Sequence, residues 1–219
     1  MLATGVGVRD SLTLPDGSRV ILGPLSSVKV ASGYGASARE VEVSGDAWFD
    51  VAHDERKPFT VRAGNATIVD IGTRFTVRSD AGAGIAVSVT EGSVSLRDVN
   101  VSAADGVILK AGDNGVLGKD GHIVTSRGTA GEDDVAWMSG KLVFREAPAS
   151  EVIASVHRWY GLDLRISDSS LVNRHITATF NGESPERMLE VLRLVLGAEM
   201  ERNGDTVVVR AAGGSVRSR

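Results

Sequence analysis

The hydrophobic pattern changes its period once along the chain, and this change limits the possible folds more than any other feature. From residue 11 to about residue 125, apolar and polar residues alternate over short runs such as 41–51. Alternation with a period of two residues is typical of half-buried antiparallel strands. Turn-forming pairs such as Asp16-Gly17 separate the runs. We therefore predict an all-β domain over residues 1–127.

Three segments of this region resemble one another, each an apolar run that meets a glycine. Residues 41–47 and 87–94 are the clearest copies, with one residue inserted before the glycine, and 108–112 is a weaker third copy. A strand, a kink at glycine and another strand would stack into a sandwich or into a solenoid-like layer. The sequence leaves both arrangements open.

After a change of composition at 128–140, the apolar residues recur with a helical period. The segment 128–140 has small residues and an acidic run and is predicted to be a linker. Two apolar stripes follow, each begun by a proline and each ended by a glycine, at Gly161 and Gly197. Strand-like runs flank both stripes, so residues 141–212 are predicted to form a small βαβ-βαββ domain. The predicted fold class is α+β, with a disordered tail at 213–219.

Charge and missing residue types argue against several classes of function. The net charge of −4 offers no basic surface for nucleic acid, and the absence of cysteine removes disulfides, thiolate metal sites and cysteine nucleophiles. No stretch approaches the roughly 18 apolar residues of a membrane span, and no signal peptide begins the chain. We expect a cytoplasmic protein or a piece of a longer exported one. No metal and no cofactor is expected, because no metal-ligand spacing joins His53, His122, His157 and His175.

The dipeptide Gly72-Thr73 has a possible chemical role. Glycine tolerates strained backbone angles, and a threonine hydroxyl placed against the preceding carbonyl could attack it. An N-to-O acyl shift followed by hydrolysis would then cleave the chain once at this bond. The alternative is that Gly72 is a bulge where the strand 74–77 begins. No other catalytic residues are predicted, because no pair of carboxylates is placed by spacing for a hydrolase.

Two aromatic pairs, Trp48-Phe49 and Trp159-Tyr160, have two possible interpretations. In a strand, one member of such a pair faces the core and the other covers the sheet. An exposed member could instead bind a partner, because interfaces favour aromatic residues.

The order and spacing of several segments resemble the FecR family of anti-sigma factors and sigma regulators. Trp137 and Gly140 resemble that family's junction to its C-terminal domain, and 141–212 is similar to the short N-terminal domain of secretins and TonB-dependent receptors. Asp46 stands where the family usually has glutamate. The resemblance covers nearly the whole chain and rests on 14–20, 45–51, 58–61, 71–77, 89–94 and 109–112.

The resemblance implies a regulator rather than an enzyme. Such proteins cross the inner membrane once and hold an extracytoplasmic-function sigma factor on the cytoplasmic side. Their periplasmic part senses a TonB-dependent outer-membrane receptor loaded with a ferric siderophore or a similar ligand. Some members cleave themselves at a Gly-Thr bond that Gly72-Thr73 matches. This chain would be the periplasmic signalling part, with its transmembrane helix and its sigma-binding cytoplasmic segment outside the chain.

In this interpretation the βαβ domain would dock the signalling domain of the receptor, by adding a strand to an exposed sheet edge. Thr177 and Thr179 are candidates on one edge, and Val207 and Val209 on the other. The alternative is a cell-envelope module that binds glycan or peptidoglycan through its aromatic pairs. A groove around Trp48 with polar neighbours would favour this module, and a smooth sheet edge would favour docking.

Overall fold

The structure is a computed structural model that describes residues 1–70, 72–80, 84–102 and 106–212. The chain divides into two compact units, Met1–Ser139 and Gly140–Arg219. No helix within the described ranges is long and apolar enough to span a membrane. The predicted disordered tail lies outside the described residues.

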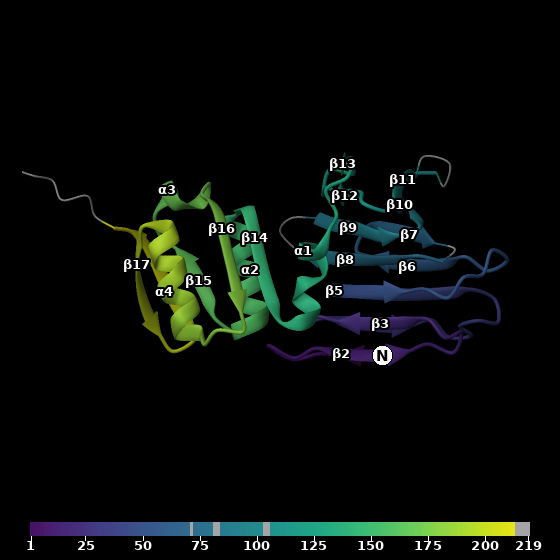
Figure 1. Cartoon of the computed structure of the whole chain (residues 1–219), viewed down its shortest axis with the longest axis horizontal. Coiled ribbons are helices and arrows are strands. Elements are labelled where there is room, and N and C mark those ends of the chain that lie inside the picture. Colours follow the sequence, from purple (N-terminus) through teal and green to yellow (C-terminus); the bar gives the residue numbers. More distant parts are fainter. Residues whose placement is uncertain (71, 81–83, 103–105, 213–219) are drawn as a thin grey trace, which may run out of the picture. The chain divides into compact units, whose positions relative to one another are not determined.

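The described part of the first unit contains thirteen strands (Figure 1). A short helix, α1 (Glu132–Val135), and a 3-10 turn, η2 (Ala136–Ser139), follow the last strand. The strands are β1 (Leu2–Ala3), β2 (Asp10–Thr13), β3 (Arg19–Leu22), β4 (Ser27–Val30), β5 (Arg39–Asp50), β6 (Phe59–Ala63), β7 (Ala66–Asp70), β8 (Arg74–Asp80), β9 (Gly84–Glu91), β10 (Ser93–Asp98), β11 (Val107–Lys110), β12 (Asn114–Leu117) and β13 (Ile123–Ser126).

The long strand β5 belongs to two sheets, which we name A and B. Its first half pairs with β4 and, in parallel, with β6, and sheet A continues through β7, β10 and β11. Its second half pairs with β3 and β8, and sheet B continues through β9, β12 and β13. The two sheets enclose one hydrophobic core, as in a sandwich. In this core Phe49 stacks on Phe75 at 5.0 Å between ring centroids and lies 5.8 Å from Phe59.

Four of the points where the chain passes from one sheet to the other lie at glycines. β5 crosses at Gly45, and Gly72, Gly92 and Gly112 lie in the connections β7–β8, β9–β10 and β11–β12. Their φ angles are +85°, +149°, +79° and +89°, values that glycine adopts without the steric cost of a Cβ atom. At Gly45 a Cβ atom would also lie 2.9 Å from the Cα of Ser26. The faint sequence repeat therefore reflects crossings between two sheets.

A buried arginine ties the loops at one end of this unit together. Arg39 is 2% exposed and donates to the carbonyls of Ala52 and Lys57, both at 2.6 Å. Its Nη1 also lies 3.0 Å from the carboxylate of Asp16. The hydroxyl of Tyr34 donates to the same carboxylate oxygen at 2.9 Å. Sequence analysis did not identify this network, because nothing in the local pattern distinguishes Arg39 from a surface arginine.

Two carboxylates make the stability of the first unit depend on pH. Burial raises the pKa of Asp16, but hydrogen bonds from the Ser18 backbone, Arg39 and Tyr34 outweigh it, so this pKa lies below its usual range. A hydrogen bond from Arg19 is the main cause that lowers the pKa of Asp50. A carboxyl whose pKa is lower in the folded state stabilises the fold above its unfolded-state pKa, and this stabilisation is lost as the pH falls through the folded-state pKa.

We therefore expect the free energy of unfolding of the first unit to fall once the pH drops below about 4, the usual carboxyl range. Urea titrations at several pH values between 7 and 2.5, followed by circular dichroism, measure it. The variant Asp16→Asn should have a lower free energy of unfolding at pH 7 and a weaker dependence on pH. An unfolding midpoint that stays constant over this range would contradict the expectation.

The second unit contains two small sheets and two main helices around a separate core. One sheet pairs β14 with β16, and the other has the order β15-β18-β17, with β15 and β18 parallel. The predicted order of elements is present, with one extra short helix, and the α+β class is confirmed in its broad form. The elements are β14 (Lys141–Pro148), α2 (Ala149–Tyr160), β15 (Asp163–Ile166), α3 (Ser169–Val172), β16 (His175–Asn181), α4 (Pro185–Leu196), β17 (Ala198–Asn203) and β18 (Thr206–Ala211).

The helix ends follow the predicted signals. The side chain of Ser184 caps the first turn of α4 by accepting a hydrogen bond from the backbone of Arg187 at 3.3 Å. Pro148 precedes the first residue of α2. Gly161 and Gly197 end the two helices in the left-handed conformation, with φ of +70° and +58°.

Residues 128–139 differ from the linker that the sequence predicts, because they fold onto sheet B within the first unit. The carboxylate of Asp134 accepts a hydrogen bond from Ser88 at 3.2 Å. The side chain of Trp137 is 5% exposed, and Arg9 donates to its carbonyl at 3.3 Å. Burial of a tryptophan fixes this segment, so the boundary between the units falls at Ser139 and Gly140.

Candidate functional site

The Gly72–Thr73 bond lies in the connection between β7 of sheet A and β8 of sheet B. Asp70, at the end of β7, is 2% exposed and accepts a hydrogen bond from the amide of Gly72 at 2.9 Å. The carbonyl of Thr73 accepts one from the amide of Val51 at 3.0 Å. Hydrogen bonds therefore hold the backbone on both sides of the bond, with Gly72 at a φ of +149°.

The side chain of Thr73 is enclosed. It is 3% exposed, and its Oγ1 has no hydrogen-bond partner within the part of the chain that the structure describes. A Cβ atom on Gly92 would lie 3.2 Å from the Cβ of Thr73 and 3.1 Å from the carbonyl oxygen of Gly72. A side chain at position 92 would therefore crowd the Gly72–Thr73 bond, and glycine avoids this contact. The acyl shift predicted from the sequence requires the hydroxyl of Thr73 to reach the carbonyl carbon of Gly72, the residue before it in the chain.

The structure also tests the simpler interpretation of Gly72. The β8–β9 ladder has an irregularity between Arg74 and Phe75, where β8 begins, and Gly72 lies two residues before this strand. The positive φ of Gly72 carries the chain between the sheets. The acyl shift that the sequence predicts would use the same positive φ of Gly72.

The predicted docking residues of the second unit lie in two different environments. Val207 and Val209 do not lie on an edge, because β18 is the central strand, paired with both β15 and β17. The two valines are 0% and 1% exposed, which corrects the prediction for them. Thr177 and Thr179 lie on β16, with both side chains exposed. β16 pairs with β14 alone among the described strands, so its other edge has no strand partner.

The other sheet edges of this unit carry features that discourage strand addition. β14 is interrupted by a register shift after Phe144, where Glu146 has a φ of +48°. β15 is a short strand of 4 residues in which Asp163 pairs with Arg165 at 2.8 Å. β17 exposes a run of charged residues, and β16 between 175 and 181 has no lysine, arginine, carboxylate or proline. The edge of β16 is thus the least protected against a new strand.

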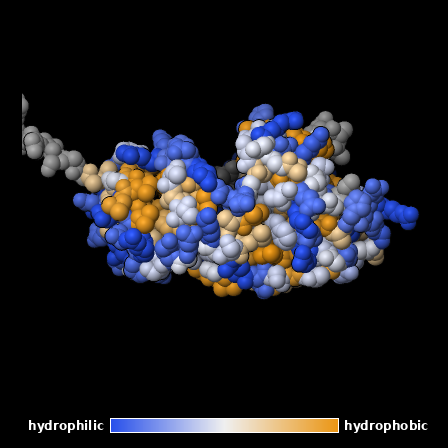
Figure 2. Space-filling view, in the orientation of Figure 1, coloured by the Kyte–Doolittle hydropathy of each residue, from blue (hydrophilic) through white to orange (hydrophobic). Residues whose placement is uncertain are grey.

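The second unit also exposes an apolar patch. Figure 2 shows mostly hydrophilic side chains on the visible face of the second unit, with an apolar patch in the region of α4. On this helix Leu194 is 65% exposed and Val195 is 42% exposed. The patch adds a second surface on which a protein partner can bury apolar area.

The two aromatic pairs lie differently. Trp159 and Tyr160 pack against the core of the second unit. Trp48 is partly exposed and lines a pocket of about 270 Å³ on sheet B, together with Ser11, Thr13 and Arg19. A groove with polar neighbours is therefore present at Trp48.

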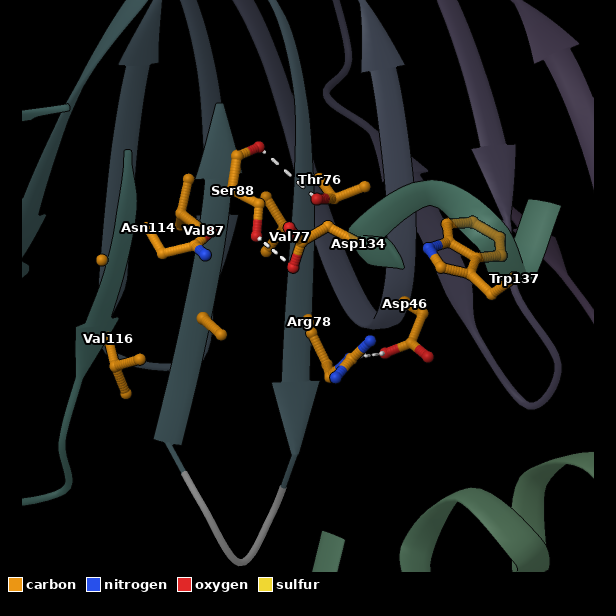
Figure 3. A pocket seen from close by; sticks show the side chains of 12 residues that line it. Asp46, Thr76, Val77, Arg78, Val87, Ser88, Asn114, Val116, Asp134 and Trp137 are labelled. Atoms are coloured by element: carbon orange, nitrogen blue, oxygen red, sulfur yellow. Dashed lines mark hydrogen bonds and ion pairs between the residues drawn. The ribbon is translucent and has the colours of Figure 1, made fainter. Parts of the chain in front are cut away.

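A second pocket, of about 170 Å³, lies on sheet B beside α1 and is lined by both polar and apolar side chains (Figure 3). Asp46 is 5% exposed, and its carboxylate lies 3.7 Å from the Nε of Arg78. On the other side of the pocket, Asn114 has a buried Oδ1 atom without a hydrogen-bond partner in the described chain. Sequence reasoning missed this pocket because its residues come from several strands and a helix.

Comparison with known proteins covers both units. The family model "FecR protein" matches residues 1–95, and the model "FecR, C-terminal" matches residues 141–209. Two crystal structures of a protein from Parabacteroides distasonis ATCC 8503, assigned as an anti-sigma factor, are similar to the chain. The first has 25% identity and a TM-score of 0.87 over 97% of this chain and 99% of that chain. The second has 26% identity and a TM-score of 0.86 over 97% and 98%. No curated protein sequence matches.

Proposed function

The chain belongs to the FecR family, and we propose that it is the periplasmic signalling region of a transmembrane anti-sigma factor, a regulator rather than an enzyme. It would relay ligand occupancy of a TonB-dependent outer-membrane receptor to an extracytoplasmic-function sigma factor. Contacts with the membrane and with the sigma factor would be made by segments outside this chain. The family matches and the similarity to a protein assigned as an anti-sigma factor support the regulatory role.

The free edge of β16 is the observation that carries the docking step. A strand from the receptor's signalling domain could pair with this edge through backbone hydrogen bonds, while Thr179 contacts side chains on the incoming strand. Thr177 is already engaged, because its hydroxyl accepts from the amide of Glu146 and donates to the Glu146 carboxylate, both at 3.0 Å. Thr179 is therefore the better position for a test.

We expect Thr179→Lys to weaken binding of the receptor's signalling domain at least tenfold, or about 1.4 kcal/mol. Lysine in the middle of an edge strand is a device by which natural sheets prevent strand addition. Isothermal titration calorimetry with the whole chain measures this effect. The matched control is Ser170→Lys, which adds the same charge at an exposed position of α3. Equal affinities of the two variants would argue against β16 as the docking edge.

We also propose that the Gly72–Thr73 bond is cleaved once by the chain itself. The strained φ of Gly72 and the enclosed hydroxyl of Thr73 support this step. Cleavage would convert one chain into two fragments of a single folded unit, which a signalling protease could then separate.

The pocket at Trp48 favours one alternative function, the binding of envelope glycan or peptidoglycan. Its tryptophan ring and the hydroxyls of Ser11 and Thr13 could contact a sugar. Titration of the chain with soluble peptidoglycan fragments, compared with Trp48→Ala, tests this alternative. Saturable binding that the substitution removes would support a glycan-binding module, and no binding would leave docking as the function.

A further inference from the structure

One histidine lies against the Gly72–Thr73 bond, although nothing in the sequence links the two. His53 lies in the loop 51–58 between β5 and β6, far from Gly72 in the sequence. A Cβ atom built on Gly72 would lie 2.6 Å from the Nδ1 of His53. Because a carbon–carbon bond measures about 1.5 Å, Nδ1 lies within about 4 Å of the Cα of Gly72. The imidazole therefore packs directly on the residue whose carbonyl would be attacked.

The loop that carries His53 is fixed from both sides. On its buried side, Arg39 donates hydrogen bonds to the carbonyls of Ala52 and Lys57, at 2.6 Å each. The amide of Val51 is bonded to the carbonyl of Thr73 at 3.0 Å. The bond to be cleaved and the histidine are thus joined by a backbone hydrogen bond two residues before His53.

A carboxylate lies on the far side of the imidazole. The Nε2 of His53 is 3.7 Å from the Oε1 of Glu55, and the two side chains are 64% and 77% exposed. A contact this exposed adds little to stability. A carboxylate beside an imidazole is the pair that, in a catalytic triad, orients and holds the base that activates a nucleophile. The hydroxyl of Thr73, which has no hydrogen-bond partner in the described chain, belongs to the residue that follows Gly72.

We propose that His53 is the general base of the self-cleavage and that Glu55 orients it. The inference rests on the proposed cleavage at Gly72–Thr73. The imidazole takes the proton of the Thr73 hydroxyl, directly or through a water molecule, as Oγ1 attacks the carbonyl carbon of Gly72. The tetrahedral intermediate collapses, the Gly72–Thr73 C–N bond breaks, and the imidazolium returns its proton to the leaving nitrogen.

The product of this step is an ester between the carbonyl of Gly72 and the oxygen of Thr73. Water then hydrolyses the ester, which gives a carboxylate at Gly72 and restores the hydroxyl of Thr73, now at a new amino terminus. The imidazole is in contact with solvent, because the side chain of His53 is 64% exposed. The same base can activate that water, so one histidine serves both steps.

The test follows appearance of the fragments 1–72 and 73–219 after pulse-labelled synthesis of the whole chain. We expect His53→Ala to slow cleavage by about 10² to 10⁴-fold, the usual contribution of a general base. Added imidazole should restore part of the lost rate, because it fills the space of the missing side chain. The matched control is His157→Ala, at an exposed position of α2 in the second unit, which should cleave at the parent rate.

Two results would overturn the role of His53. One is cleavage of His53→Ala at the parent rate. The other is slow cleavage that imidazole does not restore although circular dichroism shows a folded chain, because His53 would then only pack against Gly72. A parent chain that never cleaves would instead refute the proposed cleavage itself, and with it any base.

Discussion

Thr73→Val is expected to leave the purified chain in one piece, whereas the parent chain separates into fragments 1–72 and 73–219. Valine has the shape of threonine without the hydroxyl, so it fills the enclosed space and removes only the nucleophile. Denaturing gels and intact mass measure the result, with 22.9 kDa for the uncleaved chain. Thr73→Ser keeps a hydroxyl and should still cleave. Recovery of the parent chain only at its full mass would contradict the proposal.

The two fragments should stay together under native conditions. β7 before the bond remains paired with β6 and β10, and β8 after it remains paired with β5 and β9. Both strands also contribute to the same core, through residues such as Ile68 and Phe75. Size-exclusion chromatography should therefore give one peak at the same position for the parent and for Thr73→Val. Separate elution of the fragments would show that cleavage unfolds the unit.

Arg39→Met is expected to lower the free energy of unfolding of the first unit by about 3–5 kcal/mol, the usual cost of removing one partner of a buried ion pair. Methionine keeps the apolar part of the side chain but removes the Arg39 donors from the carboxylate of Asp16 and from the carbonyls of Ala52 and Lys57. Urea unfolding followed by circular dichroism measures the change. The same variant should also slow cleavage, because the loop that carries His53 loses its inner support.

The matched control is Arg62→Met on the neighbouring strand β6. Arg62 also pairs with a carboxylate, that of Glu40 at 2.6 Å, but its side chain is 46% exposed. Exposed pairs contribute roughly 0–1 kcal/mol, so this variant should unfold almost as the parent does. Equal losses in the two variants would mean that burial of Arg39 does not govern its contribution.

The sequence predicts local structure well where the physical signal is local. Alternation places Val41, Val43 and Phe49 of β5 inward because successive side chains of a strand point to opposite faces. The helix ends at Gly161 and Gly197 follow from the left-handed conformation that each requires. Strand order was harder to predict, because alternation reports which face of a strand is buried and says nothing about its neighbours.

Val207 and Val209 illustrate this limit. With Val208 they form a continuous apolar run, which is typical of a central strand and was the available sign that β18 is not an edge. Trp137 was a similar sign that residues 128–139 are not a free linker. For His53 the sequence carried no such sign, since only the fold brings it to Gly72.

The measurement that tests the central claim most directly is amide hydrogen exchange of the whole chain, with and without the signalling domain of its receptor. A strand added at β16 gives its outward amides new hydrogen bonds. We expect slower exchange in 175–181 on binding and unchanged exchange in 198–203 of the charged edge β17. Binding that protects β17 and leaves β16 unchanged would contradict docking at the β16 edge.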